Sequence, residues 1–417
     1  MIDVRAMIEA NRGGEGKGLP CFCTANGHVL RAILDFAADT GLPTVIEATC
    51  NQVNQEGGYT GMKPSDFMAW IGEMAADADV PMEQLILGGD HLGPNPWRRE
   101  PAAVAMEKAK ELVKLYAAAG FRKIHLDASM PLGDEPPLSF EVIAERAADL
   151  CSVVEAHAPD PQRLIYIIGT EVPIPGGETE EPDALDVTSL PRLQETIATH
   201  RDAFSERGLE EAWSRIVSVV TQPGVDFGHT SVFTFDPEPA KPLAEAILAE
   251  PGISYEAHST DYQPTEALAD LVRNHFFFLK VGPELTFRFR EAVFALAGIE
   301  AVVRPEARSN LADVVARRMG ENDAFWRDYY HGTNAETAVL RTYSYSDRIR
   351  YYWSDPEVSQ ALNAMIRTLA DADFSEAVVS QFFAGLDFGR IPKDPNALIS
   401  AHVQRSVRRY FQAAGLA

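Results

Sequence analysis

The sequence predicts an α/β protein built on a (β/α)₈ TIM barrel and continued by a C-terminal helical extension. Three observations support this prediction. Short apolar runs alternate with longer amphipathic runs eight times between about residues 18 and 300, and eight β-then-α units make such a barrel. No glycine-rich dinucleotide motif follows the first apolar run, which disfavours a doubly wound open sheet, the alternative fold. Beyond Gly298 the alternation stops.

The apolar runs define eight strands in chain order. We expect them at residues 19–23, 44–48, 85–87, 123–126, 164–168, 216–220, 253–256 and 276–281. Amphipathic patterns between them predict helices, for example over 29–38, 101–119, 140–157 and 190–204. Pro101 falls in the first turn of one of these helices, where proline's fixed φ is favourable. A long acidic loop, 171–187, follows the fifth strand.

The last part of the chain reads as helices. We expect them at 304–318, 323–330, 355–370 and 399–413, with an aromatic stretch at 343–353. The sequence therefore divides into a barrel, 1–300, and a helical extension, 301–417, packed on it. The aromatic stretch is expected to pack against the barrel, and an oligomer interface is the alternative.

Composition narrows the class of function. Lys and Arg number 37 against 61 Asp and Glu, a formal net charge of -24, which opposes binding to nucleic acid or anionic membranes. The negative net charge does not exclude an anionic small substrate, because charges far from the site are screened over about 10 Å. Neither a signal peptide nor an apolar run of about 20 residues is visible, so we expect a cytoplasmic protein. The four cysteines show no zinc or disulfide spacing.

Polar residues cluster where the predicted strands end. In barrels of this kind the functional side chains lie at the C-terminal ends of the strands, so these residues should converge on one mouth. In chain order they are Asn26, Glu47, Asn51, Gln52, Asp90, His91, His125, Asp127, Glu171, His229, His258, Ser259, Asp261, Lys280 and Gly282.

A metal site is predicted at this mouth. His91, His229 and His258 end three different strands, and Glu171 is a further candidate ligand. Imidazole and carboxylate ligands suit zinc or manganese, and three protein ligands leave one coordination position open for substrate. The alternative for each histidine is a hydrogen-bonded structural role. For His125 the two interpretations stay equally open.

The remaining candidates are assigned to catalysis and substrate binding. Asp90, with Asp127 or Glu171, is expected to move protons next to the metal, although Asp90 could instead cap a turn. Loops after strands seven and eight often bind phosphate at a helix N-terminus. We therefore expect an anion there; a structural ion pair or a Schiff base are the alternatives for the lysine. The substrate-binding residues are Asn26, Glu47, Asn51, Gln52, Ser259, Asp261, Lys280 and Gly282.

Long blocks of the sequence resemble the tagatose-bisphosphate aldolase accessory (Z-subunit) family. They are 46–62, 87–94, 123–130, 168–178, 255–263, 279–283 and 343–353, so the resemblance covers nearly the whole chain. It implies a barrel and a role in the tagatose 6-phosphate branch of galactitol catabolism. It also implies that Asp90 and His91 are similar to the acid and metal-binding histidine of class II aldolases.

Members of this family have been described in three ways, which gives three expectations. The first is a metal-dependent 4-epimerase that interconverts D-tagatose 6-phosphate and fructose 6-phosphate. The alternative is a non-catalytic stabilising subunit of class II D-tagatose-1,6-bisphosphate aldolase. A tagatose 6-phosphate kinase is poorly supported, because the sequence has no ATP-binding glycine motif. The expected partners are a sugar phosphate, an aldolase catalytic subunit and a second copy of the chain.

Overall fold

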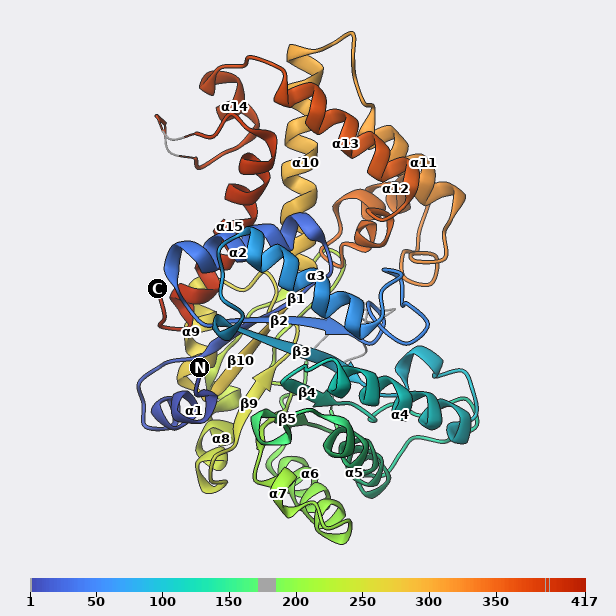
Figure 1. The fold of residues 1–417 in the computed structure, drawn as a ribbon, viewed down its shortest axis with the longest axis vertical. Coiled ribbons are helices and arrows are strands. Elements are labelled where there is room, and N and C mark those ends of the chain that lie inside the picture. Colours follow the sequence, from blue (N-terminus) through green and yellow to red (C-terminus); the bar gives the residue numbers. More distant parts are fainter. Residues whose placement is uncertain (1, 172–184, 387, 390) are drawn as a thin grey trace.

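Eight parallel strands form a closed barrel at the centre of the computed structural model, which describes residues 2–171, 185–386, 388–389 and 391–417 (Figure 1). The order around the barrel is β1-β10-β9-β6-β5-β4-β3-β2, which confirms the predicted fold. The strands are β1 (Leu19–Cys23), β2 (Thr44–Thr49), β3 (Leu85–Leu92), β4 (Lys123–Leu126), β5 (Ile165–Ile168), β6 (Ile216–Val220), β9 (Ser254–Ala257) and β10 (Phe276–Val281).

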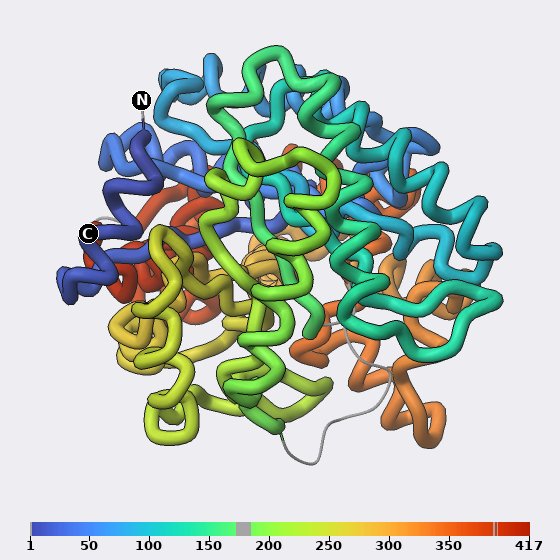
Figure 2. Tube along the Cα trace, turned by 90° about the horizontal axis from the view of Figure 1, so that it is seen from below, coloured from blue at the N-terminus to red at the C-terminus, as the bar shows by residue number. Residues whose placement is uncertain are grey.

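Helices surround these strands, as the view from below in Figure 2 shows. They are α1 (Val4–Arg12), α2 (Gly27–Thr40), α3 (Pro64–Asp77), α4 (Ala102–Ala118), α5 (Phe140–His157), α6 (Leu190–Glu206), α7 (Glu210–Trp213), α8 (Pro237–Ala246), α9 (Thr265–Arg273) and α10 (Pro283–Val303). Short 3₁₀ turns are η1 (Met82–Gln84), η2 (Asn95–Trp97), η3 (Pro161–Arg163) and η4 (Ile247–Ala249). A small hairpin, β7 (Asp226–Phe227) and β8 (Val232–Phe233), follows β6.

Strand β3 is longer than the sequence suggested. The apolar run ends at Leu87, but the strand continues through two glycines to Leu92. A Cβ at Gly88 would lie 2.7 Å from the Glu47 carboxylate, so only glycine lets that side chain pass. The pairing with β4 shifts between Gly89 and Leu92. Asp90 and His91 therefore belong to the strand and not to the loop after it. An irregularity of this kind changes the direction in which the side chains beside it point.

The barrel interior is layered. Its lower part is apolar, with Leu19, Val45, Ile167 and Phe277 packed together, and Ile8 of α1 joins the same cluster. Above this layer the interior becomes charged, because Glu47, Lys123, His125 and Glu256 are each fully buried. The apolar layer therefore supports a charged layer at the C-terminal ends of the strands.

The helical extension lies over one end of the barrel (Figure 1). Its elements are α11 (Leu311–Glu321), α12 (Asn334–Tyr343), η5 (Arg348–Tyr352), α13 (Pro356–Ala370), α14 (Glu376–Phe382) and α15 (Pro395–Ala413). The long helix α10 runs from the barrel mouth into the extension, so residue 300 falls inside a helix. The division into two domains at this residue stays a prediction.

Two expected helices of the extension differ in the structure. The first begins at Leu311 and not at 304, because Pro305 disfavours helical backbone at the residue before it and α10 ends at Val303. In place of the helix expected at 323–330, residues 324–329 form consecutive turns. The stretch 343–353 contains the end of α12 and the 3₁₀ turn η5.

Buried polar contacts tie the extension to the barrel. Glu284, in the first turn of α10, has no exposed surface and accepts hydrogen bonds from Ser406 Oγ and Arg409 Nη2, each at 2.5 Å. The Tyr262 amide donates to the same carboxylate at 2.6 Å. The last helix, α15, is thereby fastened beside the barrel mouth.

Within the described part of the chain, no helix combines the length and apolar character needed to span a bilayer.

Candidate functional site

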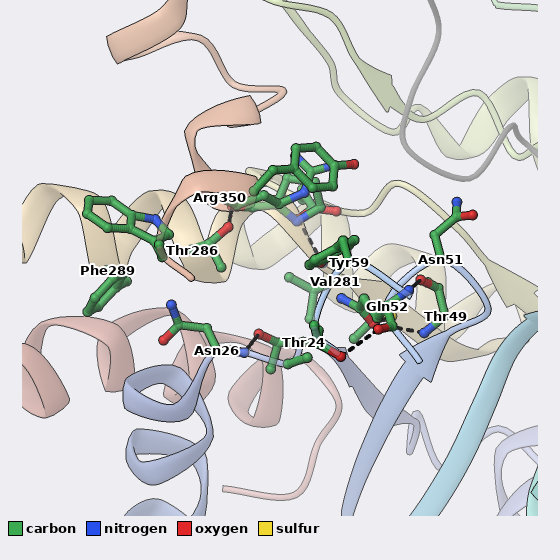
Figure 3. A pocket seen from close by; sticks show the side chains of 18 of the residues that line it. Thr24, Asn26, Thr49, Asn51, Gln52, Tyr59, Val281, Thr286, Phe289 and Arg350 are labelled. Carbon is green, nitrogen blue, oxygen red and sulfur yellow. Dashed lines mark hydrogen bonds between the residues drawn. The ribbon is translucent and has the colours of Figure 1, made fainter. Parts of the chain in front are cut away.

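A cavity of about 540 Å³ opens at the C-terminal ends of the strands, beneath the extension. This volume lies within the range of about 300–1,000 Å³ that is typical of small-molecule sites. Figure 3 shows Asn26, Thr49, Asn51 and Gln52 on the barrel side. Of the residues predicted for the site, those lining the cavity are Asn26, Asn51, Gln52, Asp90, His91, His229, His258, Ser259, Asp261, Lys280 and Gly282.

A network of charged side chains lies at the barrel end of this cavity, and we call it the mouth cluster. Its members are Glu47, Asp90, His91, Lys123, His125, Asp127, Glu256, His258 and Lys280. Lys123 Nζ lies 2.6 Å from Glu47 Oε1 and 2.5 Å from Glu256 Oε2. Lys280 Nζ contacts the other oxygen of Glu47 and lies 3.0 Å from Asp90 Oδ1. The two lysines thus link carboxylates from three strands.

Asp90 is held as a carboxylate. Its Oδ1 lies 3.0 Å from His125 Nδ1, and Cys23 Sγ donates to Oδ2 at 3.5 Å. Burial alone would raise the pKa of Asp90, but the neighbouring imidazoles of His91, His125 and His258 outweigh it and hold the pKa well below its usual range. Asp90 is therefore ionised where it faces the cavity.

His91 is oriented by Asp127. Its Nδ1 lies 2.9 Å from Asp127 Oδ2, and Ser129 Oγ donates to the other oxygen at 2.7 Å. These contacts lower the pKa of Asp127 to about 2, although burial acts in the opposite direction. Burial lowers the pKa of His91, but Asp90 and Asp127 raise it overall. The His91 backbone is left-handed, with φ at 50°, a conformation that costs of the order of 1–3 kcal/mol.

The donors of the mouth cluster fit a divalent metal ion. Asp90, His125, Glu256 and His258 each offer a donor atom, and these atoms lie within 4.8 Å of one another. Ligands at about 2.0–2.2 Å from one ion lie up to about 4.4 Å apart, so small shifts suffice. Within the described chain, the buried Nε2 atom of His125 has no hydrogen-bond partner. A buried nitrogen without a partner is costly unless something binds it.

The charge of the mouth cluster leads to the same conclusion. Its four buried carboxylates are those of Glu47, Asp90, Asp127 and Glu256. Its two buried ammonium groups, Lys123 and Lys280, balance two of these charges. Without a metal, protonated imidazoles compensate the two remaining negative charges, consistent with the lowered pKa of Asp90 and the raised pKa of His91; a divalent cation bound by neutral imidazoles would take their place. Unbalanced buried charge is strongly unfavourable.

Three predicted metal ligands, His91, His229 and Glu171, lie outside this donor group, and the ring of His91 is held by Asp127 as described above. His229, between β7 and β8, has its Nδ1 3.0 Å from Ser346 Oγ of the extension, and its ring packs edge-on against Tyr330. Glu171 lies 2.5 Å from Arg192 Nε and accepts a hydrogen bond from Thr188, and it does not line the cavity. Most of the acidic loop that follows Glu171, residues 172–184, lies outside the described residues.

Two of the groups expected to hold an anion, Lys280 and the N-terminus of α10, are engaged within the protein. Lys280 is paired with Glu47 and Asp90, and burial lowers its pKa. The amide groups of Gly282 and Glu284 donate to Asp261 Oδ1 at 3.0 and 2.8 Å. A protein carboxylate thus caps the N-terminus of α10, where an anion was expected. Burial raises the pKa of Asp261 to about 7.

Sequence reasoning did not assign three residues that the structure brings to the site, namely Lys123, Glu256 and Arg350. For the first two a signal existed. Lys123, His125 and Asp127 are spaced by two in an apolar strand, and Glu256 and His258 repeat this spacing. Residues spaced by two point to the same face of a strand, so the pattern indicates a polar layer inside the barrel. Arg350 carried no comparable signal.

Known proteins resemble this chain over nearly its whole length. The chain is 45% identical over 415 residues to the "D-tagatose-1,6-bisphosphate aldolase subunit GatZ" of Klebsiella pneumoniae subsp. pneumoniae, covering 98% of both proteins. The protein of the same name from Salmonella typhimurium is equally similar. A crystal structure described as a probable tagatose 6 phosphate kinase from Sinorhizobium meliloti 1021 has a TM-score of 0.88 and 42% identity, covering 95% of this chain and 100% of that one. The model of the family "D-tagatose-1,6-bisphosphate aldolase subunit GatZ/KbaZ-like" matches residues 4–415, and the chain belongs to this family.

Proposed function

We propose that the chain is the non-catalytic stabilising subunit of a class II D-tagatose-1,6-bisphosphate aldolase. The observation that carries this proposal is the 45% identity, over 98% of both proteins, to proteins named "D-tagatose-1,6-bisphosphate aldolase subunit GatZ". The sequence alone led us to expect a 4-epimerase first and this role second, and the comparisons reverse that order. A kinase role is not supported by any ATP-binding motif in the sequence.

Co-purification tests this proposal. We expect an affinity-tagged class II aldolase catalytic subunit, co-expressed with this chain, to retain it in stoichiometric amount through size-exclusion chromatography. The specific control is the same catalytic subunit co-expressed with an unrelated barrel protein of similar size and net charge. Recovery of the catalytic subunit without this chain, at micromolar concentrations of both, would show that the two do not form a stable assembly.

A second candidate function is favoured by the mouth cluster. Replacing buried ion pairs by well-packed apolar residues is often neutral or stabilising, so a barrel that serves only as a scaffold has no need for nine charged or imidazole side chains at its mouth. Their convergence on a cavity of about 540 Å³ supports a metal-dependent sugar-phosphate enzyme, with the 4-epimerase as the specific form.

The chemistry of this second candidate follows from the contacts of Asp90. Held as a carboxylate next to His125 and Lys280, it can accept a proton from a substrate hydroxyl or carbon in the cavity. A bound divalent ion would supply polarisation of the sugar carbonyl. Asp127 keeps His91 in one orientation beside Asp90. Retro-aldol and proton-transfer chemistry both need this combination.

We propose that His125, His258 and Glu256 hold the ion, zinc or manganese, with Asp90 beside them. The expected result is that His125→Ala and His258→Ala each lose most of the metal bound by the wild-type chain, because each removes one donor of the close group. His229→Ala, the matched control, should retain it, since His229 contacts Ser346 instead. Elemental analysis after dialysis against each metal measures this. Loss of metal only in His229→Ala would contradict the assignment.

A further inference from the structure

Two lysine or arginine side chains line the cavity in the described part of the chain, and only one is paired with carboxylates. Lys280 is held between Glu47 and Asp90. Arg350, from η5 of the extension, has no carboxylate of the described residues within ion-pair distance of 4.0 Å. A partly buried cation facing a cavity without a paired anion is a candidate anion-binding group.

The guanidinium of Arg350 is fixed in place by its neighbours. Its Nη1 donates to the carbonyl oxygens of Ser346 and Asp347, and its Nη2 donates to Tyr351 Oη at 2.9 Å. The Tyr351 ring lies 4.5 Å from the guanidinium carbon and packs edge-on against Tyr59 of the barrel, at 4.9 Å. Figure 3 shows Arg350 above Tyr59 and Val281. The side chain is therefore oriented before any ligand arrives.

One edge of this guanidinium is unused. Arginine has five N–H donors, and the described hydrogen bonds of Arg350 account for those on Nη1 and one on Nη2. The Nε–H and the second Nη2–H make no hydrogen bond to the described residues. Two parallel donors of this kind match two oxygens of a phosphate group.

We propose that Arg350 binds the phosphate group of a sugar phosphate on the extension side of the cavity. This inference rests on the second candidate function, a sugar-phosphate enzyme, and names the residue that selects the phosphorylated sugar. It follows that the extension completes the binding site and does more than stabilise the barrel. It also provides an anion site in place of the α10 N-terminus, which Asp261 occupies.

Isothermal titration of the full-length chain, at constant metal content, tests this inference with D-tagatose 6-phosphate and D-tagatose as probes. Arg350→Gln should weaken binding of the phosphorylated sugar by about 10- to 100-fold, the loss expected for charged hydrogen bonds. Binding of D-tagatose should stay within about threefold of wild type, a change below 1 kcal/mol. Arg350→Lys should give an intermediate loss, because lysine keeps the charge and loses the paired donors.

The matched control is Arg317→Gln. Arg317 belongs to the same extension but pairs with Glu321 and Glu357 outside the cavity, so both sugars should bind as in wild type. Equal weakening of both sugars in Arg350→Gln, or no weakening of the phosphorylated one, would overturn the inference, as would absence of phosphate-dependent binding in wild type. If Arg350→Gln does not fold, the test rests on Arg350→Lys, which should weaken binding of D-tagatose 6-phosphate and leave binding of D-tagatose unchanged. Failure to assemble with the aldolase leaves this result unchanged, so the two proposals fail separately.

Discussion

Lys123→Met should lower the free energy of unfolding by about 3–5 kcal/mol, the usual cost of leaving a buried charge without its partner. Lys123 is fully buried and its ammonium group contacts both Glu47 and Glu256. Methionine fills similar space but leaves two buried carboxylates with one fewer cation. Urea unfolding of the purified chain, followed by circular dichroism, measures the loss.

The control for this substitution is Lys110→Met. Lys110 makes an exposed pair with Glu107 one helical turn away, and such pairs contribute about 0–1 kcal/mol. Equal losses in the two variants would contradict the role given to Lys123. In that case the buried network would contribute no more than a surface pair.

The effect of Lys123→Met should also depend on pH. Burial raises the pKa of Glu256, but Lys123 and His258 lower it to about 2, below its ordinary value of 4.5. A lowered pKa in the folded state gives stability that is present above pH 4.5 and is lost as the pH falls towards 2. The difference between variant and wild type should therefore shrink over this interval.

Asp90→Asn should lower turnover of D-tagatose 6-phosphate to fructose 6-phosphate by about 10²- to 10⁴-fold, the contribution of a general base. Asparagine keeps the shape of Asp90 and its position beside His125, but it cannot accept the proton. Because asparagine occupies the same space at the cavity wall, the Michaelis constant should stay close to that of wild type. A coupled assay of fructose 6-phosphate, with the isolated metal-loaded chain, measures both constants.

Asp323→Asn makes the same chemical change in an exposed pair with Arg327 and should leave turnover unaffected. Wild-type turnover in Asp90→Asn would refute the catalytic assignment of Asp90. An isolated wild-type chain without any turnover would remove the 4-epimerase candidate altogether. The stabilising-subunit proposal does not depend on this outcome, because Asp90→Asn leaves the outer surface of the barrel unchanged.

The barrel could be predicted because its signal is local. Four predicted strands, such as 123–126 and 276–281, coincide with the observed ones, since each apolar run is bounded by polar or turn residues. The extension of β3 to Leu92 could not be predicted from the sequence, because glycines and charged residues interrupt the apolar run. Only the tertiary structure shows that the Glu47 side chain fills the space above Gly88.

The site was predicted in part for a related reason. Strand-end position identifies which residues can reach the mouth, and Asp90, His91 and His258 do so. The position of a residue at a strand end does not show whether its charge is already paired with another group of the protein. The pairing of Lys280 with Glu47, and the capping of α10 by Asp261, join residues more than 20 positions apart. Arg350 was missed because the strand-end rule does not consider a side chain from beyond the barrel.

The central proposal, a stabilising subunit, is tested most directly by the half-life of an aldolase catalytic subunit at a temperature at which it inactivates alone. Cleavage of D-tagatose 1,6-bisphosphate is followed over time with increasing amounts of this chain. We predict that the half-life rises with concentration and reaches a plateau at one chain per catalytic subunit, because a partner that binds only the folded state stabilises it by about 2.7 kcal/mol at 100 times its dissociation constant. An unchanged half-life in the presence of an excess of the folded chain would contradict the proposal.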